Sequence, residues 1–195
     1  MRSIAVVYHS TYNNTKTQAQ AVMAGIHKVP NVKAELIEVE SISQEQWDFI
    51  HNAEGLIFGS PTYLGSVSSK FKAFMEKTGG IWAEQGWSGK MAAGFCSSDC
   101  ASGDKLQVLT QMLLFSAQHG MNWINLGLMP GDIDRSGDEN NLNRVGGWIG
   151  AMAQKDKTNG GLYPCDLKTA EHLGSHVAQT IKRHDFSDQL QSQSA

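Results

Sequence analysis

One stretch near the amino terminus limits the possible folds more than any other: an apolar run that leads into a loop of hydroxyls and amides. Residues 3–8 are mostly apolar and β-branched, which predicts a strand buried on both faces. After the loop, Ala19, Val22, Ala24 and Ile26 fall close to helical spacing. A loop between a strand and a helix aims backbone N–H groups at one point, which suits a phosphate. The alternative is an ordinary connection in which an Asn or Ser caps the helix.

The side chains of this first loop (residues 10–15) indicate which phosphate it would bind. The loop consists of Ser10, Thr11, Tyr12, Asn13, Asn14 and Thr15. It lacks both the Gly-Lys-Ser/Thr end of a P-loop and the G-x-G-x-x-G pattern. A neutral loop of hydroxyls and N–H groups suits the phosphate of flavin mononucleotide (FMN) better than a magnesium nucleotide.

Composition narrows the class of protein. With 195 residues the chain is expected to form a single domain, 1–195, and its net charge of −3 leaves no basic footprint for nucleic acid. No apolar run approaches the roughly 18 residues of a membrane span. The first strand follows the amino terminus directly, without a signal peptide. The three cysteines, Cys96, Cys100 and Cys165, are an odd number without metal-ligand spacing, which fits a protein of the reducing cytoplasm. We expect Cys96 and Cys100 to be small buried residues.

Strands and helices alternate along the first two thirds of the chain. Apolar runs predict strands at residues 3–8, 32–39, 53–59, 91–96 and 122–128, with helices in most of the intervals. The pattern then breaks: residues 129–163 form an insertion or lid, within which 146–153 is strand-like again. We interpret this as a fifth strand interrupted by an excursion. A final helix begins at Pro164, and residues 186–195 are expected to be a frayed tail.

This alternation predicts an α/β fold with a doubly wound, five-stranded parallel sheet. Ligands of such sheets bind beyond the carboxyl ends of the strands. Besides the first loop, a second loop (residues 61–65) and a third loop (residues 97–103) lie at that edge, and all three are rich in hydroxyls, amides or glycine. We expect them to converge on one ligand that carries a phosphate and a flat, polar-edged ring. The acidic run at 132–134 is interpreted as a solvated face, and no metal site is expected.

Two blocks of the sequence resemble a known family. Gly59-Ser60-Pro61-Thr62-Tyr63-Leu64-Gly65 is followed by the run from Phe71 to Trp82, which ends in Thr-Gly-Gly-Ile-Trp. Together they are similar to the WrbA-type NAD(P)H:quinone oxidoreductases, a branch of the flavodoxin-like FMN proteins. The first loop, Gly89-Lys90 and His119-Gly120-Met121 are similar too, so the likeness covers most of residues 1–128.

The resemblance implies a flavodoxin-like fold, an FMN cofactor and NAD(P)H as co-substrate. The FMN phosphate would bind the first loop, and the ring would lie between two sets of residues: Pro61, Thr62, Tyr63, Leu64 and Gly65 on one side, Ser97, Ser98, Asp99, Cys100 and Gly103 on the other. Trp82, His119 and Tyr12 would border the quinone and nicotinamide site, with His119 donating a hydrogen bond to the quinone oxygen. The family is typically tetrameric, and neighbouring subunits help to enclose the flavins.

Two departures from the family pattern leave alternatives open. The family's loop at 97–103 is rich in glycine and threonine, whereas this chain carries Asp99, which could disfavour an anionic reduced ring or could point to solvent. Residues 129–164 match the family poorly. The alternative functions are a flavodoxin-type one-electron carrier, and a flavodoxin-like scaffold that uses flavin weakly or not at all.

Overall fold

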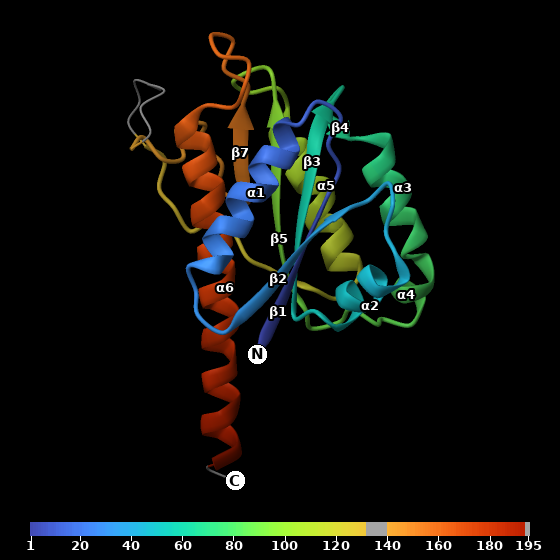
Figure 1. The fold of residues 1–195 in the computed structure, drawn as a ribbon. Coiled ribbons are helices and arrows are strands. Elements are labelled where there is room, and N and C mark those ends of the chain that lie inside the picture. Colours follow the sequence, from blue (N-terminus) through green and yellow to red (C-terminus); the bar gives the residue numbers. More distant parts are fainter. Residues whose placement is uncertain (132–139, 194–195) are drawn as a thin grey trace.

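The computed structural model describes residues 1–131 and 140–193, with side chains described through His184. A central sheet separates two helical layers: α1 and α6 cover one face, and α2, α3, α4 and α5 cover the other (Figure 1). The helices are α1 (Asn14–His27), α2 (Gln44–Asn52), α3 (Ser69–Lys77), α4 (Gly79–Ala83), α5 (Lys105–Gln118) and α6 (Pro164–Gln193).

The sheet has the doubly wound order β2-β1-β3-β5-β6. Its strands are β1 (Arg2–Tyr8), β2 (Val32–Glu38), β3 (Gly55–Tyr63), β4 (Ser66–Val67), β5 (Met91–Ser98), β6 (Asn122–Trp123) and β7 (Ala151–Gln154). All pairs are parallel except β3 with β4. The predicted α/β fold with a parallel sheet is therefore confirmed.

The interrupted fifth strand is confirmed as well. β6 pairs with the start of β5, at Met91 and Ala92, and β7 pairs with its end, at residues 95–98. Both pieces run parallel to β5, so they occupy the same edge position of the sheet. The chain between them leaves the sheet and returns to it.

Two apolar cores hold the layers together. On the face covered by α2 to α5, Phe58, Phe71, Phe74 and Phe115 pack edge-on or tilted against one another, and Phe115 also packs edge-on against the buried Trp87. On the other face, α1 and α6 approach so closely that only glycine fits at the crossing. A Cβ atom at Gly25 would lie 1.8 Å from the carbonyl oxygen of Glu171, and one at Gly174 would lie 2.0 Å from that of Val22.

Three local features differ from the sequence-based expectations. β3 extends to Tyr63, because Thr62 and Tyr63 pair with β4 around a two-residue turn whose residues, Leu64 and Gly65, both have positive φ. Residues 80–90 read as a loop in the sequence, whereas the structure has the short helix α4 at Gly79–Ala83. α6 continues to Gln193 where a tail was expected from 186, because no glycine or proline interrupts that stretch.

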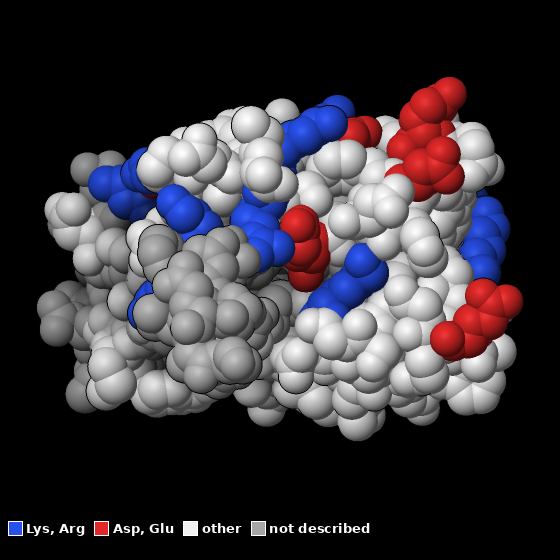
Figure 2. Space-filling model, turned by 90° about the horizontal axis from the view of Figure 1, so that it is seen from below, with Lys and Arg blue, Asp and Glu red and all other residues white. Residues whose placement is uncertain are grey.

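The part of the chain that the structure describes contains no helix long and apolar enough to cross a membrane. On the face seen from below, basic and acidic side chains are interspersed (Figure 2). The acidic run at 132–134 lies outside the described residues.

Candidate functional site

The three predicted loops line a single cavity of about 510 Å³ at the carboxyl ends of β1, β3 and β5. Its lining residues are Ser10, Thr11, Tyr12, Asn14, Thr15, Pro61, Thr62, Tyr63, Ser97, Ser98, Asp99, Cys100, Gly103 and Lys155. Of the cofactor-binding residues predicted from the sequence, Asn13, Leu64 and Gly65 are not among them. Asn13 precedes α1, and Leu64 and Gly65 form the tip of the β3–β4 turn, where the Leu64 side chain is fully exposed.

The amino terminus of α1 opens at this cavity. Asn13 stands at its N-cap position with a left-handed φ of 63°, and its side chain makes no capping hydrogen bond. The Ser10 hydroxyl accepts a hydrogen bond from the Lys16 N–H at 3.1 Å, and no acidic residue stands in the first turn. The capping interpretation therefore applies to Ser10 only, and the partial positive charge of the helix end is left without an acidic neighbour in that turn.

A buried hydrogen bond connects the first loop to the third. The Thr15 Oγ1 and Ser97 Oγ atoms lie 3.0 Å apart, and both side chains are almost completely buried. Lys155, just after β7, adds a backbone N–H that donates to the Ser98 carbonyl oxygen at 3.0 Å. The walls of the cavity are thus fixed to one another by hydrogen bonds.

The second loop contributes an unsatisfied polar atom. The Thr62 Oγ1 atom is buried and has no hydrogen-bond partner of good geometry, although Thr62 lines the cavity. It lies near the Cys96 thiol, whose pKa is raised to about 12 by burial, against smaller lowering effects of Lys105 and of Thr62 itself. Buried hydroxyls nearly always have partners, so this one is suited to a polar edge of a bound ligand.

The conformation of the third loop depends on Gly103. This residue has a left-handed φ of 53°, and a Cβ atom there would lie 2.2 Å from the Ser98 Oγ atom. Only glycine combines that φ with so close an approach at no steric cost. Gly103 therefore lets the loop fold tightly back on Ser98.

Two charged side chains of opposite sign line the cavity, Asp99 and Lys155. Lys155 was not predicted from the sequence, because it follows the excursion. There the match to the family is poor, and the point where the chain returns to the sheet sets the position of Lys155. Cys100 also lines the cavity and is exposed, so the expectation that it is buried is wrong. Cys96 is buried, as expected.

Trp82 and His119 are placed elsewhere in the single chain. They line a second hollow of about 480 Å³ between α3, α4 and α5, which we call the Trp82 hollow. Its other lining residues are Lys72, Met75, Glu76, Thr78, Gly79, Gln111, Leu114, Phe115 and Gln118. None of the first cavity's lining residues is shared with it. Tyr12 differs from this pair, because it lines the first cavity and is 78% exposed.

The hydrogen bonds of His119 fix its tautomer. The Thr78 hydroxyl donates to the Met75 carbonyl oxygen at 2.7 Å and lies 2.9 Å from His119 Nε2. Since that hydroxyl has one proton, the His119 Nε2–H must be the donor to it. Burial lowers the pKa of His119, so the ring is neutral, and its buried Nδ1 is an acceptor without a partner. In this tautomer the ring nitrogen without a partner accepts a hydrogen bond rather than donating one, and the predicted contact of His119 with a quinone stays a prediction.

Comparison with known proteins agrees with the fold. The family model described as NADPH-dependent FMN reductase matches residues 44–129. A protein named flavodoxin FldP from Pseudomonas aeruginosa is 34% identical, over 92% of this chain and 96% of its own. An NAD(P)H dehydrogenase (quinone) from Archaeoglobus fulgidus is 31% identical, over 94% and 99%.

A solved structure is similar over the same extent. The crystal structure of a flavodoxin, WrbA-like protein from Agrobacterium tumefaciens superposes with a TM-score of 0.75 at 30% identity, covering 94% of this chain and 99% of that one. The protein described here belongs to the WrbA-type family of flavodoxin-like proteins.

Proposed function

We propose that the cavity binds FMN and that the protein transfers two electrons from NAD(P)H to a quinone. The observation that carries this proposal is the convergence of three loops, from β1, β3 and β5, on one cavity at the carboxyl edge of the sheet. The membership of the WrbA-type family supports it, as do relatives that are themselves named NAD(P)H dehydrogenase (quinone).

The residues of the cavity fit FMN in kind. The amino terminus of α1 and the hydroxyls of Ser10, Thr11 and Thr15 would hold the phosphate. The buried hydroxyl of Thr62 would form a hydrogen bond with a polar edge of the ring, and residues 97–103 would line the opposite side. When bound, FMN supplies the chemistry, because it accepts a hydride from the nicotinamide and passes two electrons to the quinone.

The chain itself supplies binding, orientation and electric field. The hydrogen bond between Thr15 and Ser97 would keep the loop that holds the phosphate and the loop that lines the ring at a fixed separation. Asp99 and Lys155 place opposite charges around the ring position. The Cys96 thiol, with its pKa raised to about 12 by burial, stays protonated and takes no part in the reaction.

Trp82 and His119 would reach the ring only from a neighbouring subunit. In support, the Trp82 hollow opens to the surface: Trp82 is 50% exposed and Leu114 is 57% exposed. We therefore propose a homo-oligomer, a tetramer by resemblance, in which this hollow faces the cavity of another copy. Within it, the neutral His119 would offer Nδ1 as an acceptor, which suits the O–H of a hydroquinone product.

We place the protein in the cytoplasm, because its three cysteines are all free.

A second candidate is a one-electron carrier of the flavodoxin type. It is favoured by one observation, that a relative 34% identical to this chain is named flavodoxin. A carrier would bind FMN equally well but would exchange electrons with protein partners rather than with NAD(P)H. A scaffold that does not use flavin would be colourless and would stay colourless with added FMN.

One experiment distinguishes these functions. The purified protein is saturated with FMN, its absorption spectrum is recorded, and NADH and NADPH oxidation is followed with and without benzoquinone. We expect a flavin spectrum and nicotinamide oxidation that depends on benzoquinone. A flavin spectrum without such oxidation would overturn the reductase in favour of the carrier, and the absence of bound flavin would overturn both.

Two variants test the assigned residues. Thr15→Glu puts a carboxylate at the phosphate position and should abolish FMN binding while the apoprotein still folds, as judged by circular dichroism. Unchanged FMN affinity would remove the first loop from the site. His119→Ala should lower quinone turnover more than flavin content, and equal turnover would make His119 a structural residue only.

A further inference from the structure

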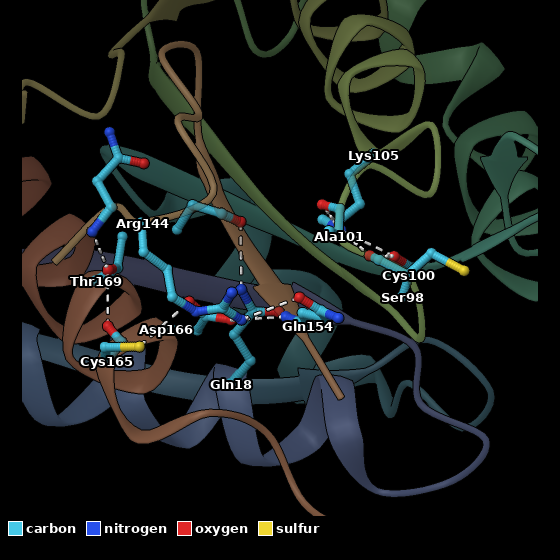
Figure 3. A network of polar contacts seen from close by, with 12 residues as sticks. Gln18, Ser98, Cys100, Ala101, Lys105, Arg144, Gln154, Cys165, Asp166 and Thr169 are labelled. Atoms are coloured by element: carbon cyan, nitrogen blue, oxygen red, sulfur yellow. Dashed lines mark hydrogen bonds and ion pairs between the residues drawn. The ribbon is translucent and has the colours of Figure 1, made fainter. Parts of the chain in front are cut away.

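A buried lysine lies directly behind the third loop. Lys105 is the first residue of α5, and its side chain is completely buried. Its ammonium group donates three hydrogen bonds: to Ser98 Oγ at 2.9 Å, to the Cys100 carbonyl oxygen at 2.7 Å and to the Ala101 carbonyl oxygen at 2.9 Å. All three acceptors belong to the third loop (Figure 3). An ammonium has three N–H donors, so each one is used.

Apart from these acceptors, the strongest influence on the Lys105 ammonium is burial, which opposes its positive charge. Burial lowers the pKa of its ammonium group, and the amino terminus of a helix disfavours a cation. The neighbouring Asp166 carboxylate accepts hydrogen bonds from Arg144 and from the Gln154 backbone N–H, so its charge is shared with the Arg144 guanidinium. The three acceptors of the loop are therefore what holds the ammonium in place, and the ammonium in turn holds the loop.

The acceptors of Lys105 stand on both sides of Asp99. Ser98 precedes this residue and Cys100 follows it, and all three line the cavity. Asp99 itself is exposed within the loop. The ammonium therefore determines where the loop carries its negative charge relative to the cavity.

We propose that Lys105 is a positioning residue of the cofactor site: its ammonium group sets the shape of the third loop and offsets the charge of Asp99 when electrons enter the bound ring. The proposal rests on the proposed function, because the ring is that of FMN. Two-electron reduction adds negative charge to a flavin. A buried cation near the ring stabilises that charge, whereas the carboxylate of Asp99 opposes it.

Three variants separate the two roles. Lys105→Met keeps an unbranched stem and removes the charge with all three donors. Lys105→Arg keeps the charge with a different donor geometry. Lys33→Met is the matched control, because it removes one exposed lysine charge on β2, outside both hollows. Each protein is measured without and with FMN.

The first readout does not need the cofactor. Amide hydrogen exchange in the apoprotein should become faster across residues 98–103 in Lys105→Met, with no change elsewhere in β5, and it should stay at the parent rate in Lys33→Met. The second readout is FMN affinity by fluorescence quenching. We expect at least tenfold weaker binding in Lys105→Met, which corresponds to about 1.4 kcal/mol.

The third readout is the reduction potential of the bound FMN. It should become more negative in Lys105→Met, stay close to the parent value in Lys105→Arg, and become less negative in Asp99→Asn. The combination Lys105→Met with Asp99→Asn should return toward the parent potential, since the two charges act in opposite directions on one ring.

The outcomes distinguish this proposal from the proposed function. Parent-like exchange in the loop together with a parent-like potential in Lys105→Met would overturn the role of Lys105 while FMN binding stands. If the parent protein binds no FMN, the proposed function fails, and the exchange experiment alone decides the positioning role. If Lys105→Met does not fold, Lys105→Arg and Asp99→Asn decide the proposal: parent-like loop exchange in Lys105→Arg together with a parent-like potential in Asp99→Asn would overturn it.

Discussion

Substitution of Gly103 by alanine would strain the third loop in two ways that can be separated. The residue has a left-handed φ of 53°, and an added Cβ atom would lie 2.2 Å from the Ser98 Oγ atom and 2.9 Å from its Cβ atom. An alanine in that region costs about 1–2 kcal/mol by itself. The clash adds about 1–3 kcal/mol, as other insertions into packed sites do. Relief of the clash moves Ser98, and with it a hydrogen bond to Lys105.

Gly89→Ala is the matched control for this prediction. Gly89 has a similar φ of 80°, has nothing within 4 Å of an added Cβ atom, and precedes β5 at the opposite edge of the sheet. Gly89→Ala should therefore lower the free energy of unfolding only by the cost of an alanine with a left-handed φ. Since each kcal/mol lowers the melting temperature of a chain of this size by about 2–4 °C, the two variants should differ by several degrees.

The decisive assay is FMN titration of both apoproteins by fluorescence quenching, with thermal unfolding of the same samples. We expect FMN affinity to fall at least tenfold in Gly103→Ala and less than about twofold in Gly89→Ala, because only the first moves a wall of the cavity. Equal affinities in the two variants would refute the reasoning that the close approach of Gly103 to Ser98 shapes the site.

Three further predictions follow from the site. Thr62→Val should weaken FMN binding without lowering the thermal stability of the apoprotein, because the hydroxyl has no partner of good geometry there; lower apoprotein stability with unchanged FMN affinity would contradict this. Burial lowers the pKa of His119 below its unfolded value of about 6.5, so the stability that its neutral form contributes is present above that pH and lost as the pH falls below it. The free energy of unfolding, measured with urea from pH 8 to pH 5, should therefore fall less steeply with decreasing pH in His119→Gln than in the parent. Equal pH dependence in the two proteins would argue against a neutral His119. Iodoacetamide should modify the exposed Cys100 of the native protein but neither Cys96 nor Cys165, and FMN should slow the reaction; no protection would place Cys100 outside the cofactor contact.

The sheet and the convergence of the loops were predictable because they depend on local patterns. The apolar run before the first loop and the alternation of strands and helices fix which ends of the strands meet at one edge. The turn at residues 64–65 falls in the predicted second loop, but the extension of β3 and its pairing with β4 were not predicted, because a leucine with positive φ, Leu64, is not a typical hairpin-turn residue.

Other features depend on how distant segments come together. Lys155 reaches the cavity only after the excursion, and no periodicity predicts where such a segment returns. The separation of Trp82 and His119 from the first cavity was not predicted, because their roles came from a family resemblance, which assigns residues to one site without giving their distance within a single chain. Lys105 was missed because a lysine at a helix start normally faces solvent, and its burial follows from the fold of the loop above it.

The division of the last strand position between β6 and β7 has a consequence for how such chains can diverge. Each piece is aligned by its own pairing with β5, so the number of residues between Trp123 and Ala151 does not set the register of either. Insertions and deletions in that interval can therefore occur at the edge of the sheet while Lys155 keeps its place in the wall of the first cavity. Such a chain can gain new surface next to the cavity without a change in the residues that line the cavity.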